Sequence, residues 1–164
     1  MTQDPRPTLA LGLSALILAA AAAAAPEPSM TLQTATGPFD VKLSPEPASA
    51  AADAAGLSRM SLDKTFHGPL QATSRGEMIA FRSATAGSAG YVAMETVRGR
   101  LAGREGSFVL QHSSTMDRGQ PAQSITVVPD SGTGALTGLA GRMTIEIAPG
   151  GAHAYRFEYT LPAP

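Results

Sequence analysis

The sequence predicts an all-β protein, a single small antiparallel β-barrel of about eight strands that follows a cleavable N-terminal signal peptide. Three observations predict this. The chain contains 17 glycines and 13 prolines, which suit many short strands joined by turns. From Arg59 onward, apolar and polar residues alternate with the period of a β-strand. A long uncharged run precedes these segments near the N-terminus.

Residues 1–24 have the layout of a secretory signal peptide. A polar start with Asp4 and Arg6 is followed by an uncharged apolar run from Leu9 to Ala25, which Pro26 ends. The run is at the short limit for spanning a bilayer, and its second half is alanine. We expect cleavage after Ala24 and an exported protein, either periplasmic or secreted. An uncleaved N-terminal anchor is the alternative.

Composition excludes several classes of function. The formal net charge is −1, and no cluster of basic residues suits nucleic acid or an anionic membrane surface. We therefore expect no nucleic-acid partner, and no membrane contact once the leader is removed. The absence of cysteine excludes disulfides, thiolate metal ligands and a cysteine nucleophile.

The remaining chain is predicted to have a flexible N-terminal segment at residues 25–36 and a barrel domain at residues 37–164. Residues 44–57 are expected to form a loop or a short helix. Short turns between successive strands favour an antiparallel meander that closes into a barrel, with a β-sandwich as the alternative. The expected strands are residues 39–43, 60–66, 77–82, 91–101, 107–116, 123–128, 136–147 and 153–161.

The hairpin around Gly103–Gly106 is the best-defined piece of this pattern. We expect Leu101 to lie opposite Phe108, and Glu95 opposite Ser114. One face of the hairpin is then apolar and points inward, and the other is polar and solvated, Ser107 included. The inward face carries Tyr91, Ala93, Glu95, Val97, Leu101, Phe108, Leu110, His112 and Met116. In the last hairpin the inward residues are Met143, Ile145, Ile147, Tyr155, Phe157 and Tyr159.

Two polar residues, Glu95 and His112, are thus placed on the inner face as diagonal cross-strand neighbours. A carboxylate there is unfavourable unless it is paired or its pKa shifts. We interpret the pair as a ligand-binding or acid/base site in the wall of a cavity. The alternative is a buried hydrogen bond that serves only the structure.

Other candidate motifs are weaker. His67, His112 and His153 could meet Glu95 in a metal site, but no two of them have the spacing of a dedicated ligand motif. We therefore expect neither a metal nor a cofactor. The glycine-rich residues 129–134 lack the lysine of a P-loop and are expected to form a turn with side-chain caps. No Gly-x-Ser-x-Gly elbow of a serine hydrolase occurs.

Several motifs occur along the chain after the leader: residues 37–41, 60–68, 90–93 with Glu95, Gly99, Leu101, 103–104, 106–112, 127–134 with Leu136, 138–139, Gly141, 153–155 and 159–162. Together they resemble the bacterial family called domain of unknown function 3224. The resemblance covers nearly the whole of the chain after the leader, although Pro69 and Gln71 stand where the family tends to have acidic residues. It implies an antiparallel barrel similar to allene oxide cyclase, and it implies no established activity, substrate or catalytic residue.

Three functions remain open from the sequence. The first is binding of a small apolar ligand inside the barrel, oriented by Glu95 and His112. The second is a cyclase or isomerase that uses the same pair for proton transfer. The third is a filled barrel that acts as an interaction module or a homo-oligomer. In the first two, the walls of the site would come from Tyr91, Phe108, Leu110, Tyr155 and Phe157.

Overall fold

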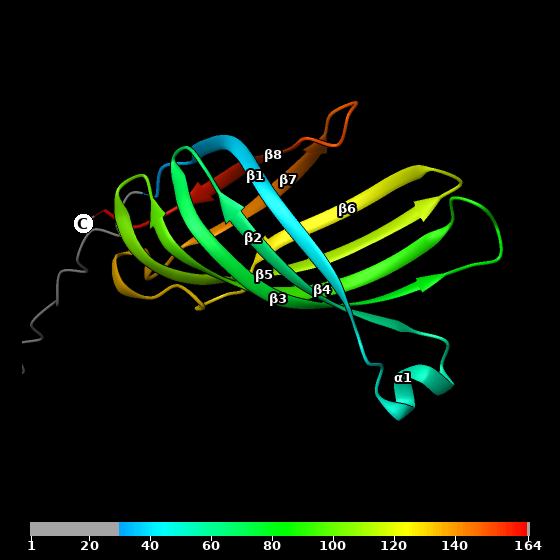
Figure 1. Ribbon diagram of the computed structural model, residues 1–164. Coiled ribbons are helices and arrows are strands. Elements are labelled where there is room, and N and C mark those ends of the chain that lie inside the picture. Colours follow the sequence, from blue (N-terminus) through cyan, green and yellow to red (C-terminus); the bar gives the residue numbers. More distant parts are fainter. Residues whose placement is uncertain (1–29, 164) are drawn as a thin grey trace, which may run out of the picture.

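A computed structural model describes residues 30–163 of the chain, so the expected signal peptide lies outside the described residues. The described part is a closed barrel of eight antiparallel strands in chain order (Figure 1), which confirms the predicted all-β class and excludes the sandwich. The only α-helix among the described residues, α1 (Ala50–Ala54), lies within the loop expected at residues 44–57. The strands are β1 (Gln33–Glu46), β2 (Ser58–Phe66), β3 (Leu70–Arg82), β4 (Ala89–Leu101), β5 (Arg104–Asp117), β6 (Gln120–Val127), β7 (Ala140–Ile147) and β8 (His153–Thr160).

Most strands are longer than the alternation predicts. Strand β1 begins at Gln33 rather than Phe39, so it includes residues 33–36 of the segment expected to be flexible, because its first residues pair with β8, Gln33 opposite Tyr159. Strand β3 begins at Leu70 rather than Glu77, because Ala72 and Ser74 are too small to make its inner face stand out in the sequence. In the other direction, Leu136 lies in a 3₁₀ turn, η1 (Gly134–Leu136), and not in β7.

The predicted register of the β4–β5 hairpin is wrong, although its faces are right. Leu101 pairs with Arg104 and Glu95 pairs with Leu110. The turn is only Ala102–Gly103, with φ angles of 49° and 82°. Two successive positive φ angles are typical of the tight two-residue hairpin turn. The register shift is an even number of residues, so every side chain keeps its predicted face.

One end of the barrel, which we call the packed end, carries the β2–β3 and β4–β5 turns and the β6–β7 connection. Aromatic side chains fill it, and Phe108 stacks on Phe157 with ring centroids 5.6 Å apart. The β6–β7 connection and the C-terminal segment bury three leucines against this core. They are Leu136, Leu139 and Leu161.

The opposite end, which we call the open end, carries the β1–β2, β3–β4, β5–β6 and β7–β8 connections. Three apolar residues there, Leu43, Met116 and Ile147, share the inward face of their strands with buried residues. Their exposed fractions are nevertheless 47%, 42% and 65%. Alternation therefore continues to the open end, but the side chains there do not seal it.

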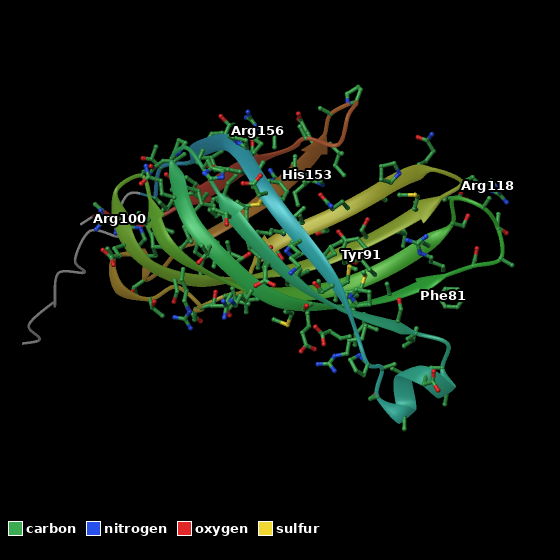
Figure 2. The ribbon with its side chains drawn as sticks, viewed as in Figure 1. Phe81, Tyr91, Arg100, Arg118, His153 and Arg156 are labelled. Atoms are coloured by element: carbon green, nitrogen blue, oxygen red, sulfur yellow. The ribbon has the colours of Figure 1, made fainter. Side chains whose placement is uncertain are left out.

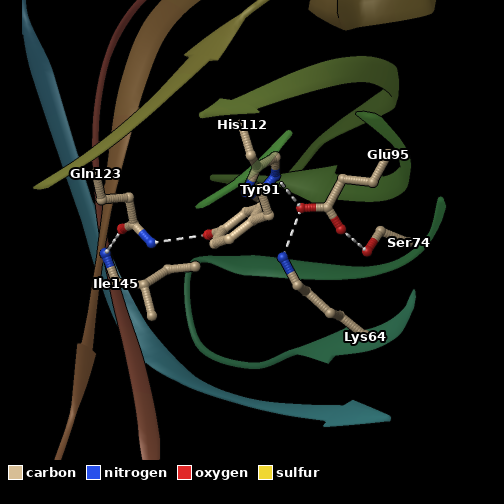
Figure 3. Close-up of polar contacts among 7 residues, drawn as sticks. All are labelled: Lys64, Ser74, Tyr91, Glu95, His112, Gln123 and Ile145. Atoms are coloured by element: carbon tan, nitrogen blue, oxygen red, sulfur yellow. Dashed lines mark hydrogen bonds and ion pairs between the residues drawn. The ribbon is translucent and has the colours of Figure 1, made fainter. Parts of the chain in front are cut away.

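Strands β6 and β7 form the weakest junction of the barrel. Only Ile125–Met143 and Thr126–Arg142 pair between them. Two residues beyond the Ile125–Met143 pair, the same register would bring Gln123 opposite Ile145, but the side chain of Gln123 spans the junction there instead. Its Oε1 accepts a hydrogen bond from the backbone N–H of Ile145 at 3.3 Å, and its Nε2 donates to the hydroxyl of Tyr91 at 3.3 Å (Figure 3).

The glycine-rich residues 129–134 serve the structure, as the capped turn predicts. The hydroxyl of Ser131 donates to the carbonyl of Val128 at 2.6 Å and accepts from the N–H of Val109 at 3.1 Å. The Oγ1 of Thr133 accepts from the N–H of Ser107 at 3.1 Å. The segment thus covers Ser107, which is buried. The expectation that Ser107 lies on a solvated face is wrong because a distant loop folds over it.

Candidate functional site

The structure brings Glu95 and His112 together on the inner face of the barrel. Strands β4 and β5 place them diagonally, because Ala93 is the residue opposite His112. Nε2 of His112 lies 2.7 Å from Oε1 of Glu95. The exposed fractions are 1% for Glu95 and 3% for His112, so the pair is part of the interior.

Two further residues complete this cluster, and sequence reasoning missed both. Nζ of Lys64 on β2 lies 2.6 Å from Oε1 of Glu95, and the hydroxyl of Ser74 on β3 donates to Oε2 (Figure 3). The signal for Lys64 was present in β2, since it alternates with Leu62 and Phe66 on the inward face. We refer to Lys64, Ser74, Glu95 and His112 as the buried cluster.

Neighbouring residues shape the place that the buried cluster occupies. The ammonium of Lys64 lies 5.5 Å from the ring centroid of Phe39 and 5.8 Å from that of Phe66, within the range of cation–π attraction. Gly76 lies opposite Glu95, and a Cβ atom there would come within 2.7 Å of the Cα and Cβ of Glu95. Only glycine at position 76 therefore allows the strands to approach so closely.

The electrostatics of the cluster favour an ionised Glu95. Burial by itself raises the pKa of this carboxyl, but the hydrogen bond from His112 and the positive charge of Lys64 outweigh it and lower the pKa to about 2. The ionised carboxylate can only accept hydrogen bonds. It therefore accepts from Nε2–H of His112, and the charges of Glu95 and Lys64 compensate each other.

The second ring nitrogen of His112, Nδ1, has no hydrogen-bond partner among residues 30–163. In that part of the chain no buried side-chain nitrogen or oxygen lacks a partner, so Nδ1 is in contact with solvent. His112 points into the barrel, and Tyr91 and Ser114, the next inward pair toward the open end, are only half-buried. The cluster thus borders the open half of the barrel.

The other candidate residues divide between the two halves. Tyr91 lies toward the open end, within the barrel, whereas Arg100 and Arg156 project outward (Figure 2). Four residues predicted to line a cavity wall lie in the hydrophobic core, and all are at most 2% exposed. They are Phe108, Leu110, Tyr155 and Phe157. The hydroxyl of Tyr155 closes the packed end, donating to the carbonyl of His67 and accepting from the N–H of Leu70.

The three histidines do not converge on a metal site. His67 is exposed and lies 2.9 Å from Oδ2 of Asp40, whereas the ring of His153 packs against Phe39 at 5.2 Å. Within residues 30–163, no group of three or more histidine, cysteine, aspartate or glutamate residues is arranged to hold a metal ion. No helix in this range is both long and apolar enough to cross a membrane.

The fold and the cluster define a small antiparallel barrel, closed by eight strands, with a charged pair buried in its interior. The chain belongs to the family described as protein of unknown function (DUF3224), whose profile matches residues 35–159. It is similar to a protein of unknown function of this family from Shewanella oneidensis MR-1, known from a crystal structure at 1.84 Å resolution. The two share 51% sequence identity with a TM-score of 0.74, over 83% of this chain and 100% of the other. No curated protein matches the chain.

Proposed function

We propose that the protein binds a small, largely apolar ligand in the open half of the barrel, above the buried cluster. The observation that carries this proposal is the contrast between the two ends: inward apolar side chains are sealed at the packed end and exposed at the open end. The mouths of β-barrels are common places for small-molecule sites, in which an apolar lining is combined with a few polar groups. Here Tyr91, Gln123 and His112 supply the polar groups.

Binding is better supported than proton transfer. A carboxyl with a pKa of about 2 is a weak base near neutral pH. Glu95 also accepts hydrogen bonds from Lys64, Ser74 and His112, which stabilise its ionised form. The cluster is therefore suited to holding His112 in one orientation. A cyclase or isomerase would have to use His112 itself as the base.

A titration of the purified protein with Nile red, a neutral apolar dye, tests the proposal. Met116 lies on the inward face at the open end, and we expect Met116→Arg to weaken dye binding at least tenfold. Met94 is a matched control, because it is 51% exposed on the outer face of β4. We expect Met94→Arg to leave dye binding unchanged.

Equal loss of binding in both variants would place the dye on the outer surface and overturn the proposal. Saturable dye binding that Met116→Arg does not weaken would also contradict it. Native mass spectrometry of protein purified from its own host provides a second measurement. We expect an added mass of a few hundred daltons, displaced by Nile red. A protein that carries no added mass and binds no dye would favour the filled barrel.

We also propose that the protein is exported. The layout of residues 1–25 supports this. Cell fractionation followed by N-terminal sequencing tests it, and we expect a mature form that starts at Ala25 outside the cytoplasm. Full-length protein that retains Met1 in the cytoplasmic fraction would contradict it.

A further inference from the structure

We infer that the outer wall of the barrel binds a tetrahedral oxyanion, a phosphate or sulfate group, at four residues of β3 and β4. They are Thr73, Arg75, Thr96 and Arg98, which we call the outer site. The two strands lie side by side (Figure 1), and the four residues alternate with buried ones, so their side chains point away from the interior. The inference is therefore independent of the proposed function, which concerns the inside of the barrel.

The register of β3 and β4 arranges the outer site as two successive cross-strand pairs. Thr73 lies opposite Arg98, and Arg75 lies opposite Thr96. The two arginines are therefore diagonal neighbours, and so are the two threonines. Diagonal neighbours on one face of an antiparallel pair are about 7–8 Å apart, within reach of long side chains. Two guanidinium groups can thus approach one anion from opposite sides, with a threonine hydroxyl beside each of them.

The surface is hollowed at the outer site. A hollow of about 440 Å³ is lined by its four residues and by Ser74. Threonine has a short side chain and arginine a long one, so the threonines form the floor of the hollow and the arginines its sides. The hydroxyl of Ser74, on the inner face between Thr73 and Arg75, donates to buried Glu95 and holds this part of β3 in place.

The outer site has hydrogen-bond donors that the protein does not use. Within residues 30–163, the guanidinium of Arg98 forms no ion pair or hydrogen bond, whereas Arg100, two residues on, pairs with Glu105. Arg75 lies 3.3 Å from Oδ1 of Asp63 through its Nε, and none of the described residues pairs with its two terminal nitrogens. Two neighbouring positive charges repel each other, and a shared anion removes that repulsion.

The number and directions of these donors select the class of anion. Each guanidinium presents a planar fork that matches two oxygens of one ligand. A carboxylate has only two oxygens, both in one plane, so it can face one fork well but not two. Phosphate and sulfate have four oxygens that point in different directions. They can therefore accept from both arginines and from the hydroxyls of Thr73 and Thr96 at once.

Nitrogen-15 NMR titration tests the inference with sodium phosphate, sulfate and acetate, at an ionic strength held constant with sodium chloride. We expect phosphate and sulfate to give saturable shifts of the backbone N–H signals of Thr73 and Thr96, and acetate to bind about tenfold more weakly. Arg98→Gln should weaken phosphate binding about tenfold, and Thr96→Val about fivefold. Arg82→Gln is the control and should leave it unchanged. Arg82 also forms no ion pair within the described range, but it lies at the other end of β3, opposite Ala89.

Equal weakening in Arg98→Gln and Arg82→Gln would show a general attraction to positive charge and overturn the inference. Acetate that binds as tightly as phosphate, or phosphate that leaves the signals of Thr73 and Thr96 unshifted, would also overturn it. Phenyl phosphate distinguishes the two sources of the group. Tighter binding than inorganic phosphate supports a phosphate carried by a larger molecule, and equal binding supports the free ion. Nile red binding should be the same in Arg98→Gln as in wild type, so the proposed function is tested separately.

Discussion

The two ends of the barrel are built from the same eight strands and differ in what their inward residues contact. At the packed end, Phe108 and Phe157 stack, and three leucines from outside the strands cover them. At the open end, the inward residues of the same strands are exposed, as Met116 on β5 and Ile147 on β7 show. The alternation of residues along a strand therefore determines which face a side chain occupies. Whether that face is buried depends on residues outside the strands, such as the leucines of the β6–β7 connection.

The comparison predicts that stability is concentrated at the packed end. Phe157→Ala should lower the free energy of unfolding by about 4 kcal/mol, because it removes a stacked aromatic ring from a filled interior. Ile147→Ala at the open end should change it by less than about 0.5 kcal/mol. Urea unfolding followed by circular dichroism measures both. Similar losses in the two variants would show that the ends do not differ in the way described.

The buried cluster lies between the two halves, and its charges should depend on each other. Lys64→Met should destabilise the protein by about 3 kcal/mol, because Glu95 remains buried without its cation. The double variant Lys64→Met with Glu95→Leu should recover much of that loss. Arg59–Glu77 provides a control pair with the same 2.6 Å separation on the surface, and Arg59→Met should have little effect. If the double variant lost as much free energy of unfolding as the two single variants lose together, the charges of Lys64 and Glu95 would not depend on each other.

Glu95 should also make the stability depend on pH. Its folded pKa of about 2 is below the ordinary value of 4.5, so the carboxylate contributes stability above pH 4.5 that is lost as the pH falls toward 2. The loss should be up to about 3 kcal/mol in wild type. In Glu95→Gln, urea unfolding across this range should give a flatter profile. Parallel profiles of the two proteins would mean that Glu95 does not have the lowered pKa.

The smallest effect is expected at the tight turn of the packed end. Ala102 has a φ angle of 49°, a region that asparagine adopts more readily than alanine. Ala102→Asn should therefore raise the free energy of unfolding by about 0.5 kcal/mol. Gly103→Ala, at a φ angle of 82°, should lower it and serves as the opposite control. A stability decrease in Ala102→Asn would argue against this turn geometry.

Much of the fold follows from local alternation, and the parts that do not are those that depend on distant segments. Alternation placed Glu95 and His112 on one inner face, and an even register error left that placement unaffected. Lys64 escaped notice because its contact with Glu95 requires β2 and β4 to approach across β3. The burial of Ser107 depends on Thr133, which no pattern within β5 can indicate.

The short β6–β7 junction is the place where the closed sheet of the barrel has the fewest paired residues. Two residue pairs and the side chain of Gln123 join these strands, whereas β1 and β8, the first and last strands of the chain, are paired from Gln33–Tyr159 to Phe39–His153. The barrel can be regarded as one sheet that runs from β7 through β8 and β1 to β6, and the β6–β7 pairing closes it. Parting of the β6–β7 junction would therefore open the sheet while β1 and β8 stay paired.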